Sequence, residues 1–216
     1  MQLIAKSRGP ESIHETLEIQ DQHWIERASN KNAPNRIIFV EHEPVYTAGA
    51  SAKIEPRNIQ NCFKVNISEL ACPVVVTGRG GLVTYQGPGI LSVYCVFELD
   101  NVTIRDFENI LLDAAEALLN LYGIEAVRRR NNPGLYLGTD RKIVSVGLKI
   151  SRGVTRYGIT VSLDPDFAYL EPLIPCGLSD VHLTSLAEET GRKKFSEREK
   201  NAIKTSLAIK LVSRLE

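Results

Sequence analysis

One cysteine, Cys176, stands where a thiol that only packs is rarely found. It lies in the stretch LIPCGLSD, between Pro175 and Gly177, and proline and glycine are the strongest markers of a turn. A packing cysteine is more often found among branched apolar residues of a strand or helix. Two interpretations stay open: a small residue that fills a tight turn, or a nucleophile whose reactive form is the thiolate.

A thiol nucleophile needs a group that takes its proton or stabilises the thiolate. Histidine is the commonest partner, but the four histidines here, at 14, 23, 42 and 182, form no cluster in the sequence. A neutral lysine can also accept the proton, and its ammonium then stabilises the thiolate by charge. Lys142, which opens the apolar run KIVSVGLKI, is the candidate.

Other signatures of site chemistry do not occur in this sequence. It contains no G-x-S-x-G, no H-E-x-x-H and no GxxxxGK[ST], so we expect no nucleophile elbow, no zinc helix and no P-loop. The run GRGGLVTYQGPG at 78–89 carries five glycines in twelve residues but does not fit G-x-G-x-x-G. It predicts a sharp bend, or a backbone that another group approaches closely. No metal and no cofactor are predicted.

Composition points to one globular domain over residues 1–216. The 26 basic residues balance the 26 acidic ones, which does not favour a nucleic-acid or membrane surface. No signal-peptide pattern and no run of 18 apolar residues occur, so we expect a cytoplasmic protein without membrane contact. The other cysteines, at 62, 72 and 95, show no disulfide or metal spacing and are expected to be small apolar fillers.

The apolar patterns predict several strands and a few helices without strict βαβ alternation, which favours an α+β fold with a mixed sheet. Turn-rich loops are expected over 41–53 and 78–89, and capping boxes at Thr103/Asp106 and Ser196/Glu199. The predicted helices cover 10–29, 103–122, a short stretch before 191, and 196–215. The predicted strands cover 36–40, 73–77, 90–99, 124–127, 134–138, 142–150 and 153–163.

Four motifs, in order, resemble those of the lipoyl/octanoyl transferase family, over about residues 36–190. They are EHEPVYTAG (41–49), RGGLVTYQGPG (79–89), KIVSVGLKISRGVTRYG (142–158) and PCGLSDVHLTSL (175–186). The resemblance implies the mixed sheet flanked by helices of the biotin and lipoate protein ligase catalytic domain. It also implies transfer of an octanoyl or lipoyl group from acyl carrier protein to a lysine of a lipoyl domain, the first step of protein lipoylation.

The same resemblance implies Cys176 as the nucleophile that carries the acyl group as a thioester, and Lys142 as its proton acceptor. No ATP is required, because the donor thioester is already activated. The implied substrate-binding residues are Arg79, Gly80, Gly81, Leu82, Val83, Thr84, Tyr85, Gln86, Ser145, Val146, Gly147, Gly158, Ile159, Thr160 and, at the pocket rim, His42.

Three positions depart from the family pattern. Gln86 and Tyr157 stand where the family has histidine, and Ser162 stands where it usually has asparagine. Glutamine and tyrosine still form hydrogen bonds but do not titrate near neutral pH. If the family histidines only position other groups, the activity is expected to survive both changes.

The implied partners are octanoyl-acyl carrier protein and the lipoyl domains of 2-oxoacid dehydrogenase complexes or of the glycine cleavage H protein, with the enzyme a monomer. Arg128–Arg130 and the trio Lys149, Arg152 and Arg156 are candidate docking patches for such acidic proteins. The alternatives are an ATP-dependent lipoate or biotin ligase, an amidotransferase that moves octanoyl between carrier proteins, and an acyl-binding protein without turnover.

Overall fold

The larger β-sheet mixes parallel and antiparallel strands. The computed structural model describes residues 2–5, 10–52, 59–129, 132–174 and 180–215, and within them eight strands follow the order β1-β2-β6-β10-β9-β8-β7, with β11 beside β9. The pairs β1–β2 and β9–β11 are parallel and the others antiparallel. The strands are β1 (Gln2–Ala5), β2 (Arg36–Val40), β6 (Ile90–Val96), β7 (Val127–Arg128), β8 (Gly134–Leu137), β9 (Arg141–Ser151), β10 (Val154–Ser162) and β11 (His182–Leu183).

A second, three-stranded sheet has the order β4-β3-β5. Its strands are β4 (Val74–Val76), β3 (Val45–Ala48) and β5 (Val83–Gln86). The loop predictions for 41–53 and 78–89 are therefore wrong in part, because each segment contains a strand. Each of these strands is four residues long and lies close to glycines, so the turn residues concealed it in the sequence.

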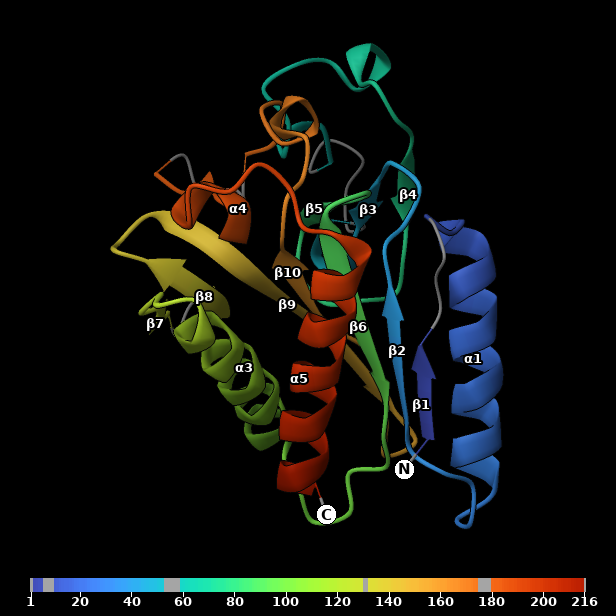
Figure 1. The fold of residues 1–216 in the computed structure, drawn as a ribbon. Helices are drawn as coiled ribbons and strands as arrows, with labels where there is room; N and C mark the ends of the chain where they lie inside the picture. Colours follow the sequence, from blue (N-terminus) through green and yellow to red (C-terminus); the bar gives the residue numbers. More distant parts are fainter. Residues whose placement is uncertain (1, 6–9, 53–58, 130–131, 175–179, 216) are drawn as a thin grey trace.

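Helices cover both faces of the larger sheet (Figure 1). They are α1 (Ile13–Ser29), α3 (Ile104–Leu121), α4 (Leu186–Glu189) and α5 (Glu197–Leu215), with 3₁₀ turns at Ala50–Ala52, Ile67–Glu69 and Phe167–Tyr169. Strand β2 shows why its run RIIFV is apolar throughout. Ile37 and Phe39 join the core that α3 and α5 cover, whereas Ile38 and Val40 face Leu17 of α1. Such burial on both faces produces a continuous apolar strand.

The predicted capping box at Ser196/Glu199 is confirmed, and at Thr103/Asp106 the threonine half of the box forms. The hydroxyl of Thr103 accepts a hydrogen bond from the Asp106 backbone N–H at 3.1 Å, and the Ser196 N–H donates to the Glu199 carboxylate at 2.8 Å. The first helix begins at Ile13, three residues later than predicted. Within the described part of the chain, none of the helices combines the length and apolar character needed to cross a bilayer.

Candidate active site

A cavity of about 440 Å³ opens between the glycine-rich segment and strands β9 and β10. Its volume falls in the range typical of small-molecule sites. The fold brings most of the predicted site residues to its wall, although they come from three separate segments of the chain. These are Arg79, Gly80, Gly81, Leu82, Val83, Thr84, Gln86, Lys142, Ser145, Val146, Gly147, Gly158, Ile159 and Thr160.

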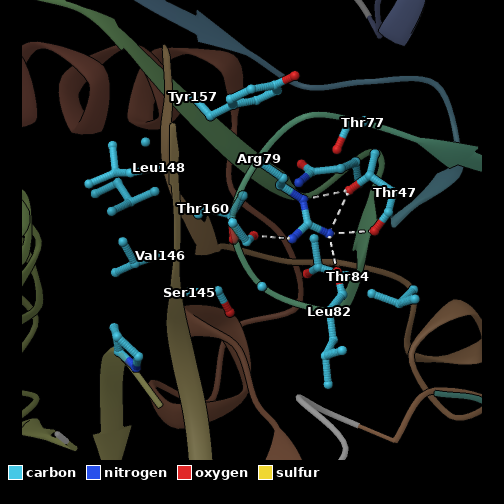
Figure 2. Close-up of a pocket in the computed structure, with 18 of the residues that line it drawn as sticks. Thr47, Thr77, Arg79, Leu82, Thr84, Ser145, Val146, Leu148, Tyr157 and Thr160 are labelled. Carbon is cyan, nitrogen blue, oxygen red and sulfur yellow. Dashed lines mark hydrogen bonds between the residues drawn. The ribbon is translucent and has the colours of Figure 1, made fainter. Parts of the chain in front are cut away.

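Arg79 braces the glycine-rich loop from inside. Its guanidinium is buried and donates to the hydroxyl and carbonyl of Thr47, to the Gly80 carbonyl at 2.9 Å and to the Leu82 carbonyl at 2.9 Å (Figure 2). Several donors of the planar fork thus bind carbonyl groups of the loop and of the neighbouring strand β3. Arg79 therefore fixes the shape of the cavity wall.

The glycine-rich loop lies so close to the backbone of neighbouring segments that no side chain fits at the points of contact. The Gly80 N–H donates to the Leu148 carbonyl of β9 at 3.0 Å, and a Cβ at Gly80 would lie 3.1 Å from that oxygen. A Cβ at Gly49 would lie only 2.3 Å from the carbonyl oxygen of Gly81. These positions require glycine for close packing, as the glycine content of the segment suggested.

Strand β9 presents different groups on its two sides. Figure 2 shows Ser145 directed toward the Arg79 loop, whereas Val146 and Leu148 project from the other side of the strand. Val146 and Leu148 pack against the core to which α3 contributes, and α3 adds Ile104 and Glu108 to the cavity lining. The alternation follows the two-residue period of a strand.

Tyr157, at a position where the family has histidine, holds the glycine-rich loop. Its hydroxyl accepts a hydrogen bond from the Gly78 N–H at 3.0 Å, and its own N–H donates to the Gln20 side chain at 2.6 Å. Tyr157 has φ +60°, a conformation that is unfavourable for a bulky residue and persists only where surrounding contacts enforce it. Burial raises the pKa of its phenol, so the group stays neutral and acts through hydrogen bonding.

The neighbouring departure, Gln86, is also fixed by a hydrogen bond. The Ser92 hydroxyl donates to its side-chain oxygen at 2.5 Å, and Gln86 is 2% exposed. Tyr85, the preceding residue of β5, points to the opposite face of that strand. It stacks on Tyr169 at 5.1 Å in the second core cluster and lies outside the 440 Å³ cavity, beside a smaller one of about 20 Å³.

His42 lies behind the cavity wall, fully buried. Burial lowers the pKa of its imidazole to about 4, so the ring is neutral at pH 7. Nδ1 lies 3.2 Å from the Glu11 carbonyl oxygen and Nε2 lies 2.8 Å from the Tyr94 hydroxyl. Because a carbonyl can only accept, Nδ1 carries the proton and Nε2 accepts from Tyr94. His42 thus contacts the cavity only through Tyr94, which lines it.

Lys142 is a buried titratable group in the wall of the cavity. Its side chain is 2% exposed and lines both cavities. Its Nζ donates to the Asn132 side-chain oxygen at 2.9 Å and lies 5.1 Å from the centre of the Tyr136 ring. The parallel pair of β9 with β11, in which Lys142 faces Leu183, fixes the backbone at this position.

Cys176 lies outside the described residues, so its distance from Lys142 stays a prediction. The other cysteines have the packing positions expected of them. Cys62 and Cys95 are buried, and burial raises the pKa of the Cys95 thiol and that of Cys72 to about 11. The thiols of Cys72 and Cys95 are thus unsuited to form a nucleophilic thiolate near neutral pH.

One arginine of each predicted basic patch is paired with acidic residues of the same chain. Arg128 binds Asp113 at 2.6 Å and Glu116 at 2.5 Å, and Arg156 binds Asp21 at 2.7 Å. These pairs reduce the positive charge that either patch offers to an acidic protein. Among the described residues, no group of three or more His, Cys, Asp and Glu is arranged to hold a metal ion.

Several cavity residues carried no signal in the sequence. Thr47 lies in a segment interpreted as a loop, and Tyr94 lies in a strand whose residues looked uniformly structural. Asn132 precedes the Pro-Gly pair of NNPGLY, after three arginines that drew the interpretation toward surface charge. In the fold, Asn132 contacts Lys142, ten residues further along the chain.

Comparison with known proteins agrees with this geometry. The family model "Lipoyl protein ligase A/B catalytic domain" matches residues 12–208, a wider span than the four motifs. An octanoyltransferase of Cutibacterium acnes is 32% identical over 195 residues, covering 88% of this chain and 68% of that protein. An octanoyltransferase of Buchnera aphidicola is 32% identical over 178 residues, covering 77% of this chain and 79% of that protein.

Solved structures show the same fold. The putative lipoate protein ligase Ta0514 of T. acidophilum superposes with a TM-score of 0.66 at 14% identity, covering 99% of this chain and 83% of that one. A lipoate-protein ligase A bound with ATP gives a TM-score of 0.63 at 15% identity, covering 98% and 83%. The expected α+β fold, a mixed sheet flanked by helices, is confirmed. The chain belongs to the lipoyl protein ligase A/B catalytic domain family, among its acyl-transferring octanoyltransferases.

Proposed function

We propose that this protein transfers an octanoyl group from octanoyl-acyl carrier protein to a lysine of a lipoyl domain, through a thioester on Cys176. The observation that carries the proposal is the place of Lys142. It is a lysine buried in the wall of a cavity, and most of the remaining wall consists of the motifs that resemble those of octanoyltransferases. A buried lysine readily changes its protonation state and is suited to proton transfer.

The reaction has two half-steps. In the first, Lys142 accepts the Cys176 thiol proton, the thiolate attacks the carbonyl carbon of the donor thioester, and the carrier thiolate leaves with that proton. In the second, the uncharged amine of the target lysine attacks the enzyme thioester. An amide forms, the Cys176 sulfur leaves, and the proton lost by the amine returns to the thiol. No oxidant, metal or nucleotide is consumed, because the thioester carries the activation.

The cavity supplies the acyl-binding site in this proposal. The octanoyl chain is flexible and apolar, and such a ligand gains most from a preformed slot. The loop that Arg79 holds forms one wall with backbone instead of side chains, and β9 forms the facing wall with Ser145 and Gly147. Backbone N–H groups of a glycine-rich loop are also suitable donors to a developing oxyanion.

The proposed partners are acyl carrier protein and the lipoyl domains of 2-oxoacid dehydrogenase complexes or of the glycine cleavage H protein, with the enzyme acting as a monomer. Their docking does not depend on strong charge steering from Arg128 or Arg156, because both already pair with carboxylates. Association is therefore expected to depend only weakly on salt.

Intact-protein mass spectrometry tests the mechanism directly. The purified protein is incubated with octanoyl-acyl carrier protein without ATP, alongside Cys176→Ser and Lys142→Ala. The wild type is expected to gain one octanoyl group that hydroxylamine removes and that a lipoyl domain discharges. Cys176→Ser should form no thioester, and Lys142→Ala should acylate on the order of 10²-fold to 10⁴-fold more slowly, the usual contribution of a positioned proton acceptor.

Matched controls separate the alternatives. Cys72→Ser removes a thiol whose pKa is raised and should acylate like the wild type. Transfer that requires ATP and free octanoate would replace this proposal with a ligase. Acyl binding without an adduct and without transfer would replace it with an acyl-binding protein that does not turn over.

A further inference from the structure

Only one of the two polar atoms of the Asn132 side chain has a hydrogen-bond partner among the described residues, and that partner is Lys142. Its Oδ1 accepts from the lysine Nζ at 2.9 Å. Its Nδ2 is buried and has no hydrogen-bond partner among the described residues. A buried donor without a partner costs stability, and native proteins retain few of them. Packing alone would favour an apolar residue here, so the contact with Lys142 is the reason to keep an amide.

The backbone around Asn132 is built to hold this contact. The Asn132 carbonyl accepts from the Tyr136 hydroxyl at 3.0 Å, and the ring of the same tyrosine lies 5.1 Å below Lys142 Nζ. Gly134 has φ +152°, and a Cβ there would lie 2.7 Å from Lys142 Cε. Asn132, Gly134 and Tyr136 form the Lys142 cradle: Asn132 accepts a hydrogen bond from the lysine, the Tyr136 ring lies near its Nζ, and Gly134 leaves room for its side chain.

The amide differs from a carboxylate in one respect that matters for proton transfer. An amide oxygen accepts a hydrogen bond from an ammonium or from a neutral amine, and it adds no charge. A carboxylate at the same point would stabilise the ammonium strongly and oppose its loss of a proton. An amide can therefore hold Lys142 in one place in both of its protonation states.

We propose that Asn132 is a positioning residue for Lys142, which keeps the lysine at the cavity wall while leaving it able to exchange a proton. This inference rests on the proposed function, in which Lys142 accepts the Cys176 proton. Asn132 acts through Lys142 and is not assigned a contact with the substrate.

The charged groups that face Lys142 are few within the described residues. Arg129 lies over the Tyr136 ring at 4.7 Å, and Arg79 of the glycine-rich loop and Glu108 of α3 line the same cavity. From β5, β9 and β10 the neighbouring cavity residues are uncharged, among them Thr84, Ser145 and Thr160. A single new charge at position 132 should therefore have a large effect on the titration of Lys142.

Titration of Lys142 by NMR tests the inference without using the enzymatic reaction. The protein is labelled with ¹³C at lysine Cε, and the Lys142 signal is identified by its loss in Lys142→Met. Asn132→Asp is expected to raise the titration midpoint by about one to three pH units, because an opposite charge at this distance shifts a pKa by that amount. Asn132→Leu, which removes the acceptor, is expected to lower it.

Asn201→Asp provides the matched control, since it makes the same charge change at an exposed position at the start of α5, and it should leave the Lys142 midpoint unchanged. If Asn132→Leu does not fold, as judged by circular dichroism, Asn132→Ala replaces it. Folded Asn132 variants that titrate at the wild-type midpoint would overturn the inference, because a purely structural asparagine would not alter the ionisation of Lys142.

The acylation rate gives a second readout. The acid limb of its pH profile should shift to higher pH in Asn132→Asp and to lower pH in Asn132→Leu, by the same amounts as the NMR midpoints. An equal loss of rate at every pH would count against positioning. If the wild type forms no acyl-enzyme, the proposed function fails, whereas the NMR titration still decides whether Asn132 controls Lys142.

Discussion

The two ends of the cavity differ in what the polar side chains of the wall bind. At the Lys142 end, the Asn132 amide keeps a buried donor without a partner among the described residues. At the Tyr157 end, the hydroxyls of Tyr157 and Tyr94 bind the Gly78 N–H and His42, and a buried donor without a partner among the described residues belongs to Gln20, which does not line the cavity. Lys142 and Leu148, the residue of β9 that pairs with Tyr157, are six residues apart. At about 3.3 Å per residue, the two ends lie roughly 20 Å apart along the strand.

Under the proposed function, the Tyr157 end supports the cavity wall and the Lys142 end transfers the proton. Groups whose hydrogen bonds are used within the wall are suited to fix its shape, and they can be exchanged for others with the same geometry. The departures at Gln86 and Tyr157 fit this pattern, because Gln86 accepts from Ser92 and Tyr157 accepts from Gly78. Neither needs to titrate to do so.

The largest expected effect comes from converting the Lys142 end into an apolar one. The double variant Lys142→Met with Asn132→Leu should acylate on the order of 10²-fold to 10⁴-fold more slowly. Its free energy of unfolding should stay within about 1 kcal/mol of wild type or exceed it, because replacing both polar partners by apolar groups of similar shape is nearly neutral or stabilising. Urea unfolding and single-turnover acylation measure the two quantities.

The single variant Lys142→Met serves as the comparison, since it leaves the Asn132 oxygen without the lysine and should be less stable than the double variant. A double variant that is several kcal/mol less stable than wild type would contradict this comparison. It would show that Lys142 and Asn132 are needed for the stability of the fold.

Acid should weaken the opposite end through His42. The pKa of His42 is lowered to about 4 in the folded state from an ordinary value of 6.5, so the unfolded chain binds a proton that the folded one does not. The stabilisation is complete above pH 6.5 and is lost progressively as the pH falls toward 4. The difference of about 2.5 pH units corresponds to roughly 3 kcal/mol.

Urea unfolding of the wild type and His42→Gln at pH 7 and pH 4.5 measures this effect. The glutamine variant should lose less stability on acidification than the wild type. Equal losses in the two proteins would assign the acid sensitivity to other groups and remove His42 from the scaffold.

The smallest expected effect is that of Tyr157→Phe. Removing the hydroxyl leaves the Gly78 N–H without this acceptor and should lower the free energy of unfolding by about 1 kcal/mol. The acylation rate should fall by less than roughly tenfold, since a tenfold change needs about 1.4 kcal/mol. Tyr122→Phe, at the end of α3, is the control. A fall in rate far beyond this, without a matching loss of stability, would place Tyr157 in the chemistry.

The sequence predicted strands and helices best where the apolar pattern was long. The α3 and α5 capping boxes and the strand at 36–40 were found because their signals are local. Strands β3 and β5 were missed because each is four residues long and lies close to glycines and a proline. Their pairing with each other, from Val45 with Gln86 to Ala48 with Val83, connects segments nearly forty residues apart, and no local pattern encodes such a contact.

The sequence by itself determined the family, through four ordered motifs, and the residue types able to do chemistry. Only the tertiary structure decided what surrounds them. It directed the Arg79 guanidinium into its own loop, placed His42 behind Tyr94, turned Tyr85 away from the cavity and brought Asn132 to Lys142. Residue identity fixes which hydrogen bonds a side chain can form, but the folded backbone decides which partner lies within about 3 Å to form them.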